Sequence, residues 1–124
     1  YEIIESRYFG FRFKTTDSVA DNISAARFKL GKDGVAPGKL HLEELGVATR
    51  FSDGSELFAT GGAVIGHPAR AVAMYVNLIS KFHDGLLKDQ IILSGAITAA
   101  TPVGKGWSVR SQFQGIGEIS LSVD

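Results

Sequence analysis

The strongest strand pattern in the chain is WSVRSQFQGIGEISLSV, residues 107–123. Its second half alternates apolar and polar residues from Ile119 to Val123. Alternation with a period of two is typical of a half-buried strand, and the glycines within residues 114–117 suit a tight turn. The pattern therefore predicts a hairpin whose strands cover residues 107–113 and 118–123.

A second hairpin is predicted around Ser52-Asp53-Gly54-Ser55, between strands at residues 40–51 and 56–60. In residues 8–13 three phenylalanines alternate with other residues, which predicts an extended segment with one buried aromatic face. Asp17 is expected to cap a short turn over residues 18–20. Further extended segments are predicted at residues 1–5, 24–30 and 91–97, the last of them buried.

One main helix is predicted from Pro68 to Phe82. Proline suits the first helical turn, because its missing N–H has no helical partner there. Apolar residues recur at helical spacing along this segment, and Gly85 follows as a possible C-terminal cap. Many predicted strands and a single helix give the fold class α+β, mainly β.

Composition excludes several classes of protein. The 124 residues fit a single domain, 1–124, and the 13 basic and 13 acidic residues leave no net charge. A nucleic-acid groove or a polybasic membrane patch is therefore not expected. The absence of cysteine excludes disulfides and thiolate sites and suits a reducing cytoplasm. The chain opens with Tyr1 inside a strand pattern, so we expect it to be part of a longer protein.

Several groups of residues could carry chemistry. The three histidines lack metal-ligand spacing, and His67 before Pro68 is interpreted as a helix cap or a supporting group. Residues 61–66 contain glycines but lack the Lys-Ser/Thr of a phosphate loop, so a turn is preferred. Ser94-Gly95 at a strand end is either a turn or a ligand contact.

Two polar positions stand out among apolar neighbours. Glu2 precedes Ile3-Ile4, so its charge should have a cation partner, either a metal ion or the arginine that composition favours. Asp21-Asn22, followed by Ser24, forms a compact polar cluster between apolar segments. This cluster is either a local turn or a set of hydrogen-bonding groups that line a site.

Several segments in order resemble the C-terminal half of the 2-keto-4-pentenoate hydratase and 4-oxalocrotonate decarboxylase group, in the fumarylacetoacetate hydrolase superfamily. The resemblance covers essentially the whole chain, and its specificity lies in the ordered set. The segments are EIIESRY (2–8), VADNIS (19–24), GHPARAV (66–72), ILSGAITAA (92–100) and FQGIG (113–117).

The resemblance implies a mixed β-roll and a Mg²⁺ (or Mn²⁺) site of three carboxylates, of which Glu2 matches the third. The first two come from a Glu-x-Glu that this chain lacks, and the lysine expected in proton transfer also lies outside it. Asp21 is assigned to holding its loop. The positions that match substrate contacts for a small 2-oxo acid are Asn22, Ser24, Ser94, Gly95 and Thr98.

The favoured activity is decarboxylation of a 2-oxo-3-enedioate in aromatic meta-cleavage catabolism, because residues 7–13 and 96–100 resemble the decarboxylase members more. Hydration of 2-hydroxypenta-2,4-dienoate is the alternative, and a binding module without metal is a third. The chain alone is expected to be incomplete and inactive. Expected partners are the missing N-terminal half, further copies of the chain and a sister hydratase or decarboxylase.

Overall fold

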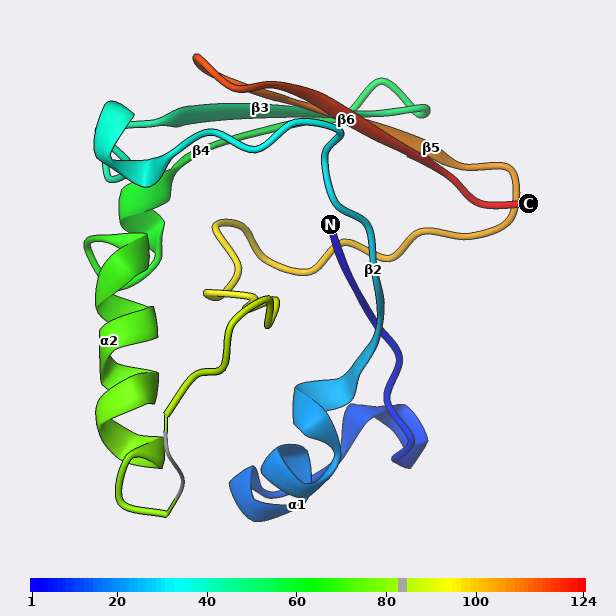
Figure 1. Ribbon diagram of the computed structural model, residues 1–124. Coiled ribbons are helices and arrows are strands. Elements are labelled where there is room, and N and C mark those ends of the chain that lie inside the picture. Colours follow the sequence, from blue (N-terminus) through cyan, green and yellow to red (C-terminus); the bar gives the residue numbers. More distant parts are fainter. Residues whose placement is uncertain (83–84) are drawn as a thin grey trace. The chain divides into compact units, whose positions relative to one another are not determined.

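The computed structural model describes residues 1–82 and 85–124. One of the three histidines considered above, His83, therefore lies outside the described residues. The chain divides into two compact units, Tyr1–Leu30 and Gly31–Asp124, which are described separately below. The described elements are two antiparallel sheets, one main helix and several short helical turns (Figure 1). This confirms the predicted α+β class.

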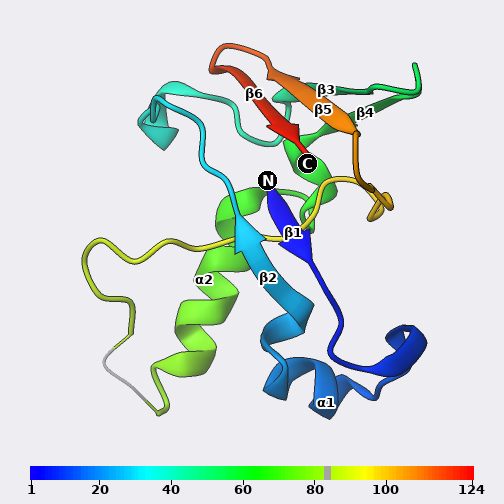
Figure 2. The same cartoon turned by 90° about the vertical axis from the view of Figure 1, so that its right-hand side faces the viewer.

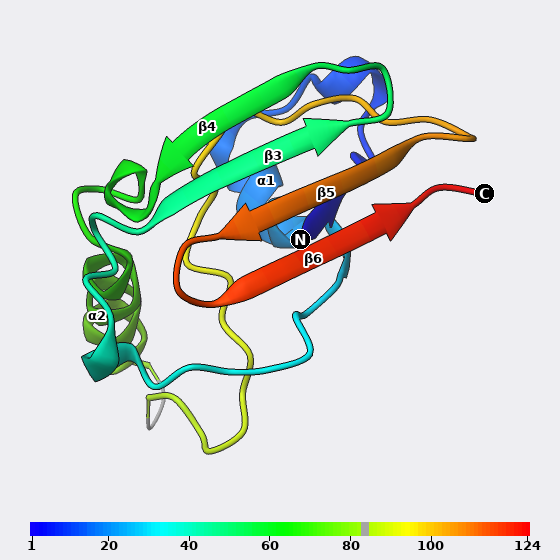
Figure 3. The ribbon, with the colours of Figure 1, turned by 90° about the horizontal axis from the view of Figure 1, so that it is seen from above.

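The larger unit contains a four-stranded sheet in the order β4-β3-β5-β6 (Figure 3). Its strands are β3 (Gly46–Phe51), β4 (Glu56–Thr60), β5 (Ser108–Phe113) and β6 (Gly117–Ser122). Both predicted hairpins are therefore confirmed, and β3 pairs with β5 to join them. Strand β3 begins at Gly46 and not at residue 40 as predicted. The chain turns before it, at His41–Glu44, where the Glu44 amide donates to the His41 carbonyl over 3.1 Å.

One face of this sheet forms the core of the unit. Val47, Val109 and Ile119 are buried there, and for Ile119 this agrees with the alternation predicted from Ile119 to Val123. Ser111 is also buried, and its hydroxyl lies 2.7 Å from that of Thr49 on the neighbouring strand. The polar group inside the core is thus hydrogen-bonded, which removes most of the cost of burying it.

Helix α2 spans Pro68–Ile79 in the larger unit and confirms the predicted main helix. It ends before Phe82, because Ser80 caps it and the Phe82 amide turns back to the Ile79 carbonyl over 2.8 Å. Gly85 is therefore not the C-terminal cap. Short 3-10 turns precede the helix at Pro37–Lys39 (η3) and Gly61–Ala63 (η4). The second of them confirms a turn, rather than a phosphate loop, at the glycines.

The predicted buried strand at residues 91–97 is wrong. The described residues of this segment form no strand, and Ile91 and Leu93 are 53% and 43% exposed. Exposure alternates from Ile91 to Ser94, as in a strand, but no backbone hydrogen bond to another strand is formed there. An apolar segment forms a strand only beside a partner, and the described residues provide none.

The smaller unit is built on an antiparallel pair, β1 (Glu2–Ile4) and β2 (Ala25–Phe28) (Figure 2). Between the strands lie the 3-10 turn η1 (Phe9–Phe11), helix α1 (Thr15–Ala20) and the turn η2 (Asn22–Ser24). Helix α1 begins before Asp17, whose carboxylate accepts from the Lys14 amide over 2.9 Å. Asp17 thus stabilises the helix start from its third position, rather than capping a turn after itself.

The predicted extended segment at residues 8–13 is also wrong. Gly10 adopts φ +61°, and the Phe11 amide donates to the Tyr8 carbonyl over 3.2 Å, so the chain turns at this point. Phe9 is 98% exposed, and the expected buried aromatic face does not form in this unit. Glycine permits the left-handed conformation, and the three-phenylalanine pattern is too short to oppose it without a strand partner.

Every strand pair formed by the described residues is antiparallel. A mixed β-roll is therefore not made by these pairs alone, and it stays a prediction. No helix in the described part of the chain has the length and apolar character required to span a membrane.

Candidate functional site

The predicted polar cluster contains an unusual left-handed turn. Asn22, Ile23 and Ser24 have φ values of +52°, +55° and +61° in succession, and none of them is glycine. The left-handed conformation costs roughly 1–2 kcal/mol for each such residue. Strained backbone of this kind concentrates at binding and catalytic sites, where surrounding contacts hold it in place. The turn is therefore the first candidate for a site in this chain.

Two polar oxygens are buried at the turn. Ser24 is 3% exposed, and its hydroxyl has no hydrogen-bond partner among the described residues. The same holds for Oδ2 of Asp21, whose side chain is 10% exposed. Buried oxygens without partners are costly, so each is available to a ligand or to further protein groups. Asn22, beside them, is exposed.

Arg7 fixes the other side of Asp21. Its Nε donates to Asp21 Oδ1 and its Nη2 donates to the Asp21 carbonyl. A third, longer contact runs from Nη1 to the Ala25 carbonyl at 3.5 Å. The prediction that Asp21 holds its loop agrees with this arrangement. Sequence reasoning missed Arg7 and Ile23, although a carboxylate between apolar segments was a signal to search for a cationic partner.

Glu2 lies apart from the turn along the same strand pair. Its Cα is paired with Phe28, whereas Glu5, three residues later, pairs with Ser24 through a 2.9 Å hydrogen bond. Glu2 and Glu5 are three residues apart in extended backbone, which separates their positions along the strand direction by about 10 Å. Glu2 is exposed and forms no ion pair within residues 1–82 and 85–124, so the expected arginine partner is wrong there. The Glu2 carboxylate interacts electrostatically with the N-terminal ammonium of Tyr1.

The described residues do not assemble a metal site by themselves. No group of three His, Asp or Glu side chains comes together among them. The exposed Glu2 carboxylate can supply one oxygen ligand, whereas Mg²⁺ takes six ligands with strict geometry. A Mg²⁺ ion would therefore need further ligands besides Glu2, such as the Glu-x-Glu carboxylates that this chain lacks.

The remaining predicted contacts, Ser94, Gly95 and Thr98, lie in the larger unit. Ser94 and Thr98 are half-buried, and no hydrogen bond of either side chain is formed within the described residues. Gly95 has φ +119°, and a side chain there would lie 3.5 Å from Val64 Cγ1. Glycine is required by this backbone conformation. Of the predicted substrate contacts, Asn22 and Ser24 thus lie together in the smaller unit. Ser94, Gly95 and Thr98 lie close in sequence in the larger unit.

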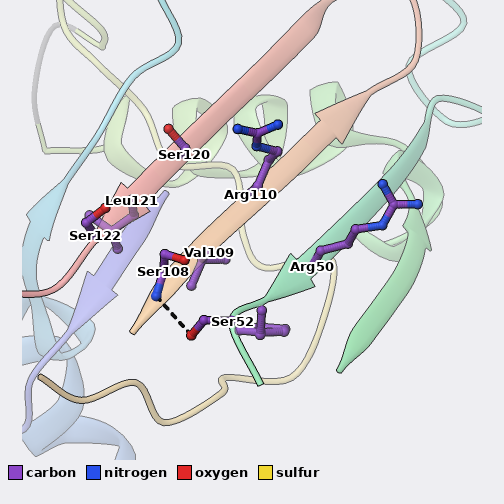
Figure 4. A pocket seen from close by; sticks show the side chains of 9 residues that line it. Arg50, Ser52, Ser108, Val109, Arg110, Ser120, Leu121 and Ser122 are labelled. Carbon is purple, nitrogen blue, oxygen red and sulfur yellow. Dashed lines mark hydrogen bonds between the residues drawn. The ribbon is translucent and has the colours of Figure 1, made fainter. Parts of the chain in front are cut away.

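A shallow hollow of about 350 Å³ lies on the four-stranded sheet (Figure 4). It contains none of the predicted site residues. Arg50 and Arg110 at its edge are cross-strand neighbours, and each faces a glutamate, Glu56 at 2.5 Å and Glu118 at 3.9 Å. Ser52 accepts from the Ser108 amide over 3.1 Å. These groups already have partners, so the hollow is not favoured as the site.

His67 is the N-cap of helix α2, which confirms its interpretation from the sequence. Its Nδ1 accepts from the Ala69 amide over 3.0 Å, so the ring proton belongs on Nε2. Nε2 lies 3.4 Å from Glu43 Oε2. Both ring nitrogens therefore face partners within the structure, and the histidine orients the start of the helix.

No family model matches the chain. The 4-oxalocrotonate decarboxylase of Pseudomonas sp. (strain CF600) is 37% identical over 96% of this chain and 45% of its own length. The 2-hydroxyhexa-2,4-dienoate hydratase of Comamonas testosteroni is 31% identical over 98% of the chain and 46% of its own length. The chain thus spans less than half the length of these relatives.

A solved structure agrees with these relatives. The 4-oxalocrotonate decarboxylase from Pseudomonas putida G7, complexed with magnesium and adipate, matches with a TM-score of 0.92 and 35% identity. The match covers 99% of this chain and 47% of that one.

The chain is therefore homologous to one part of proteins that are named as decarboxylases and hydratases. It resembles nearly half of a 4-oxalocrotonate decarboxylase or a 2-keto-4-pentenoate hydratase, which confirms the resemblance inferred from the sequence segments.

Proposed function

We propose that the complete protein decarboxylates a 2-oxo-3-enedioate of the 4-oxalocrotonate type to a 2-hydroxydienoate. The observation that carries this proposal is the TM-score of 0.92 and 35% identity to a 4-oxalocrotonate decarboxylase that was solved with magnesium and adipate. Adipate is a six-carbon dicarboxylate, as is the proposed substrate. Three relatives at 34–37% identity are also decarboxylases by name.

Hydration of 2-hydroxypenta-2,4-dienoate is the second candidate. It is supported by the hydratase of Comamonas testosteroni, which matches 98% of the chain at 31% identity. The 2-keto-4-pentenoate hydratase of Paraburkholderia xenovorans (strain LB400) matches 95% of it at 29% identity. These two hydratases are 29–31% identical and the three decarboxylases 34–37%, so the decision rests on the reaction product.

The proposed substrate contacts are polar groups at the left-handed turn and at the unpaired segment 91–98. In this proposal the buried Ser24 hydroxyl donates to a substrate oxygen and the exposed Asn22 amide binds beside it. Ser94 and Thr98 supply hydroxyls, and Gly95 allows the backbone to approach the ligand closely. Support for the turn comes from its strain and from the unpartnered Ser24 oxygen.

Glu2 is proposed as one ligand of a divalent cation, Mg²⁺ or Mn²⁺, completed by two carboxylates outside this chain. Its exposed carboxylate, with no ion-pair partner in the described residues, supports that role. When bound, such a cation acts as a Lewis acid toward the 2-oxo group. The chain's own residues then orient the 2-oxo acid and protect it from bulk water.

We further propose that the chain forms the C-terminal part of a longer catalytic domain with the β-roll of the fumarylacetoacetate hydrolase superfamily. Large apolar side chains exposed in the described residues support this, including Phe9 at 98%, Phe82 at 73% and Phe58 at 70%. Such exposure is unusual for a free domain and fits burial against a missing half or further subunits. The reducing cytoplasm is the proposed location, and a sister hydratase is a proposed partner.

The test is a product assay on the complete protein with 2-oxo-3-hexenedioate and Mg²⁺. We expect release of one CO₂ per substrate consumed, together with the ultraviolet absorbance of a conjugated 2-hydroxydienoate. A parallel assay with 2-hydroxypenta-2,4-dienoate measures loss of that absorbance by hydration. Hydration without CO₂ release would establish the second candidate, and binding without either reaction would indicate a module that has lost catalysis.

A further inference from the structure

One guanidinium connects both ends of the left-handed turn at residues 22–24. Asp21 precedes the turn and receives two hydrogen bonds from Arg7, one at its carboxylate and one at its carbonyl. Ala25 follows the turn, and its carbonyl lies 3.5 Å from Nη1 of the same arginine. The arginine therefore joins the residues on either side of the strained segment.

Besides Arg7, the turn is held by a small number of backbone hydrogen bonds. The Ser24 amide donates to the Asp21 carbonyl over 3.0 Å, and the Ala25 amide donates to the Asn22 carbonyl. The Glu5 amide donates to the Ser24 carbonyl over 2.9 Å. Three consecutive left-handed residues persist only when neighbouring groups hold them there. Arg7 is the side chain whose hydrogen bonds reach across the whole turn.

The geometry of these bonds requires arginine rather than any cation. A guanidinium presents several N–H groups in a rigid plane, so it can donate to a carboxylate and two carbonyls at once. A lysine ammonium is a single point charge and cannot reproduce this arrangement. Arg7 binds only Oδ1 of the Asp21 carboxylate. The buried Oδ2 of Asp21 and the Ser24 hydroxyl have no partner in the described residues, so both remain available to a ligand.

We propose that Arg7 is a positioning residue that maintains the left-handed turn and thereby presents Asn22 and Ser24 to the ligand. This inference rests on the proposed function only for the identity of that ligand, a 2-oxo acid. Arg7 does not itself touch the substrate in this proposal. Its effect passes through Asp21 and the backbone of the turn.

The test compares Arg7→Lys with Arg12→Lys in the complete protein. Arg12 is exposed in the same unit, and its side chain makes no hydrogen bond or ion pair with other described residues, so it controls for general loss of an arginine. We expect Arg7→Lys to raise KM about tenfold with a change in kcat below about threefold, the size expected from charged hydrogen bonds. The amides of Ser24 and Ala25 should exchange with deuterium about tenfold faster, whereas those of β3 and β5 should not change.

A double variant distinguishes positioning from a purely structural role. Ile23 is 57% exposed and β-branched with φ +55°, so Ile23→Gly removes backbone strain with little loss of packing. We expect Arg7→Lys/Ile23→Gly to recover most of the lost substrate affinity and amide protection. Equal KM and exchange rates in Arg7→Lys and Arg12→Lys would overturn the inference. Faster exchange in a protein without activity on either substrate would support the role of Arg7 and reject the proposed function.

Discussion

The Glu5 amide and the Ser24 carbonyl are joined by a 2.9 Å hydrogen bond, which links the end of β1 to the left-handed turn. The segment that carries the proposed metal ligand Glu2 is therefore hydrogen-bonded to the turn that carries Asn22 and Ser24. Glu2 lies about 10 Å further along that strand. A ligand that contacts both must extend along this direction, as an elongated dicarboxylate can.

Glu2→Gln should remove Mg²⁺ binding by the complete protein while leaving its fold unchanged. Loss of supporting groups around a metal costs 10–100-fold in affinity, so loss of a direct ligand should cost at least about 100-fold. The exposed side chain can change with an effect on stability of about 0.5 kcal/mol or less. Calorimetric Mg²⁺ titration and circular dichroism measure the two effects.

The matched control is Glu5→Gln, which removes an exposed glutamate from the same strand segment. It should retain Mg²⁺ affinity within about threefold, because a surface charge at this distance is screened. Unchanged Mg²⁺ affinity in Glu2→Gln would count against the proposed ligand.

Gly61→Ala should destabilise the larger unit strongly. A Cβ at this buried position would lie 1.9 Å from the Leu42 carbonyl oxygen, and backbone cannot move aside cheaply. We expect a loss of about 3 kcal/mol in the free energy of unfolding, at the upper end of overpacking effects. Gly34→Ala is the control, because nothing lies within 4 Å of its Cβ position. Urea denaturation of both variants would decide the point, and equal midpoints would contradict the packing shown here.

His67→Ala should weaken helix α2 at its start. The substitution removes the acceptor for the Ala69 amide and should cost about 1 kcal/mol, a typical value for an N-cap. His67→Asn restores a cap acceptor and should recover most of the loss. Thermal denaturation checks both variants, and an equally low Tm for Asn would show that the contact with Glu43 matters more than the cap.

Asp53 in the β3–β4 turn should titrate below its usual range. Hydrogen bonds from the Ser55 hydroxyl at 2.6 Å and then from the Ser55 amide at 2.9 Å lower its pKa from 3.8. Because the folded state binds this proton less readily than the unfolded state, the carboxylate stabilises the turn above about pH 4. That stabilisation is lost as the pH falls through the lowered pKa.

Carboxyl NMR titration should show the pKa of Asp53 rising toward 3.8 in Ser55→Ala. Ser52→Ala is the control, because its hydroxyl serves the Ser108 amide and does not bond to Asp53. The assignment would be wrong if both variants shifted the Asp53 pKa equally.

Local patterns were sufficient to predict both hairpins, the start of helix α2 at Pro68 and the cap by His67. Each depends on neighbouring residues, since alternation, turn glycines and an N-terminal proline act within a few positions. The segment 91–97 shows where this reasoning fails, because its apolar residues are typical of a buried strand but a strand requires a partner. Residues 8–13 also have no strand partner among the described residues, and Phe9 is exposed rather than buried.

The sequence by itself determined the hairpins, the main helix and the relationship to decarboxylases and hydratases, because these are written in local order and in ordered segments. Only the tertiary structure revealed the left-handed backbone of Asn22–Ser24, the buried oxygens beside it and the arginine across it. The physical reason is that non-glycine residues do not choose positive φ on their own. Residues distant in the chain impose it, and Arg7 reaches Asp21 only after the chain between them has folded back.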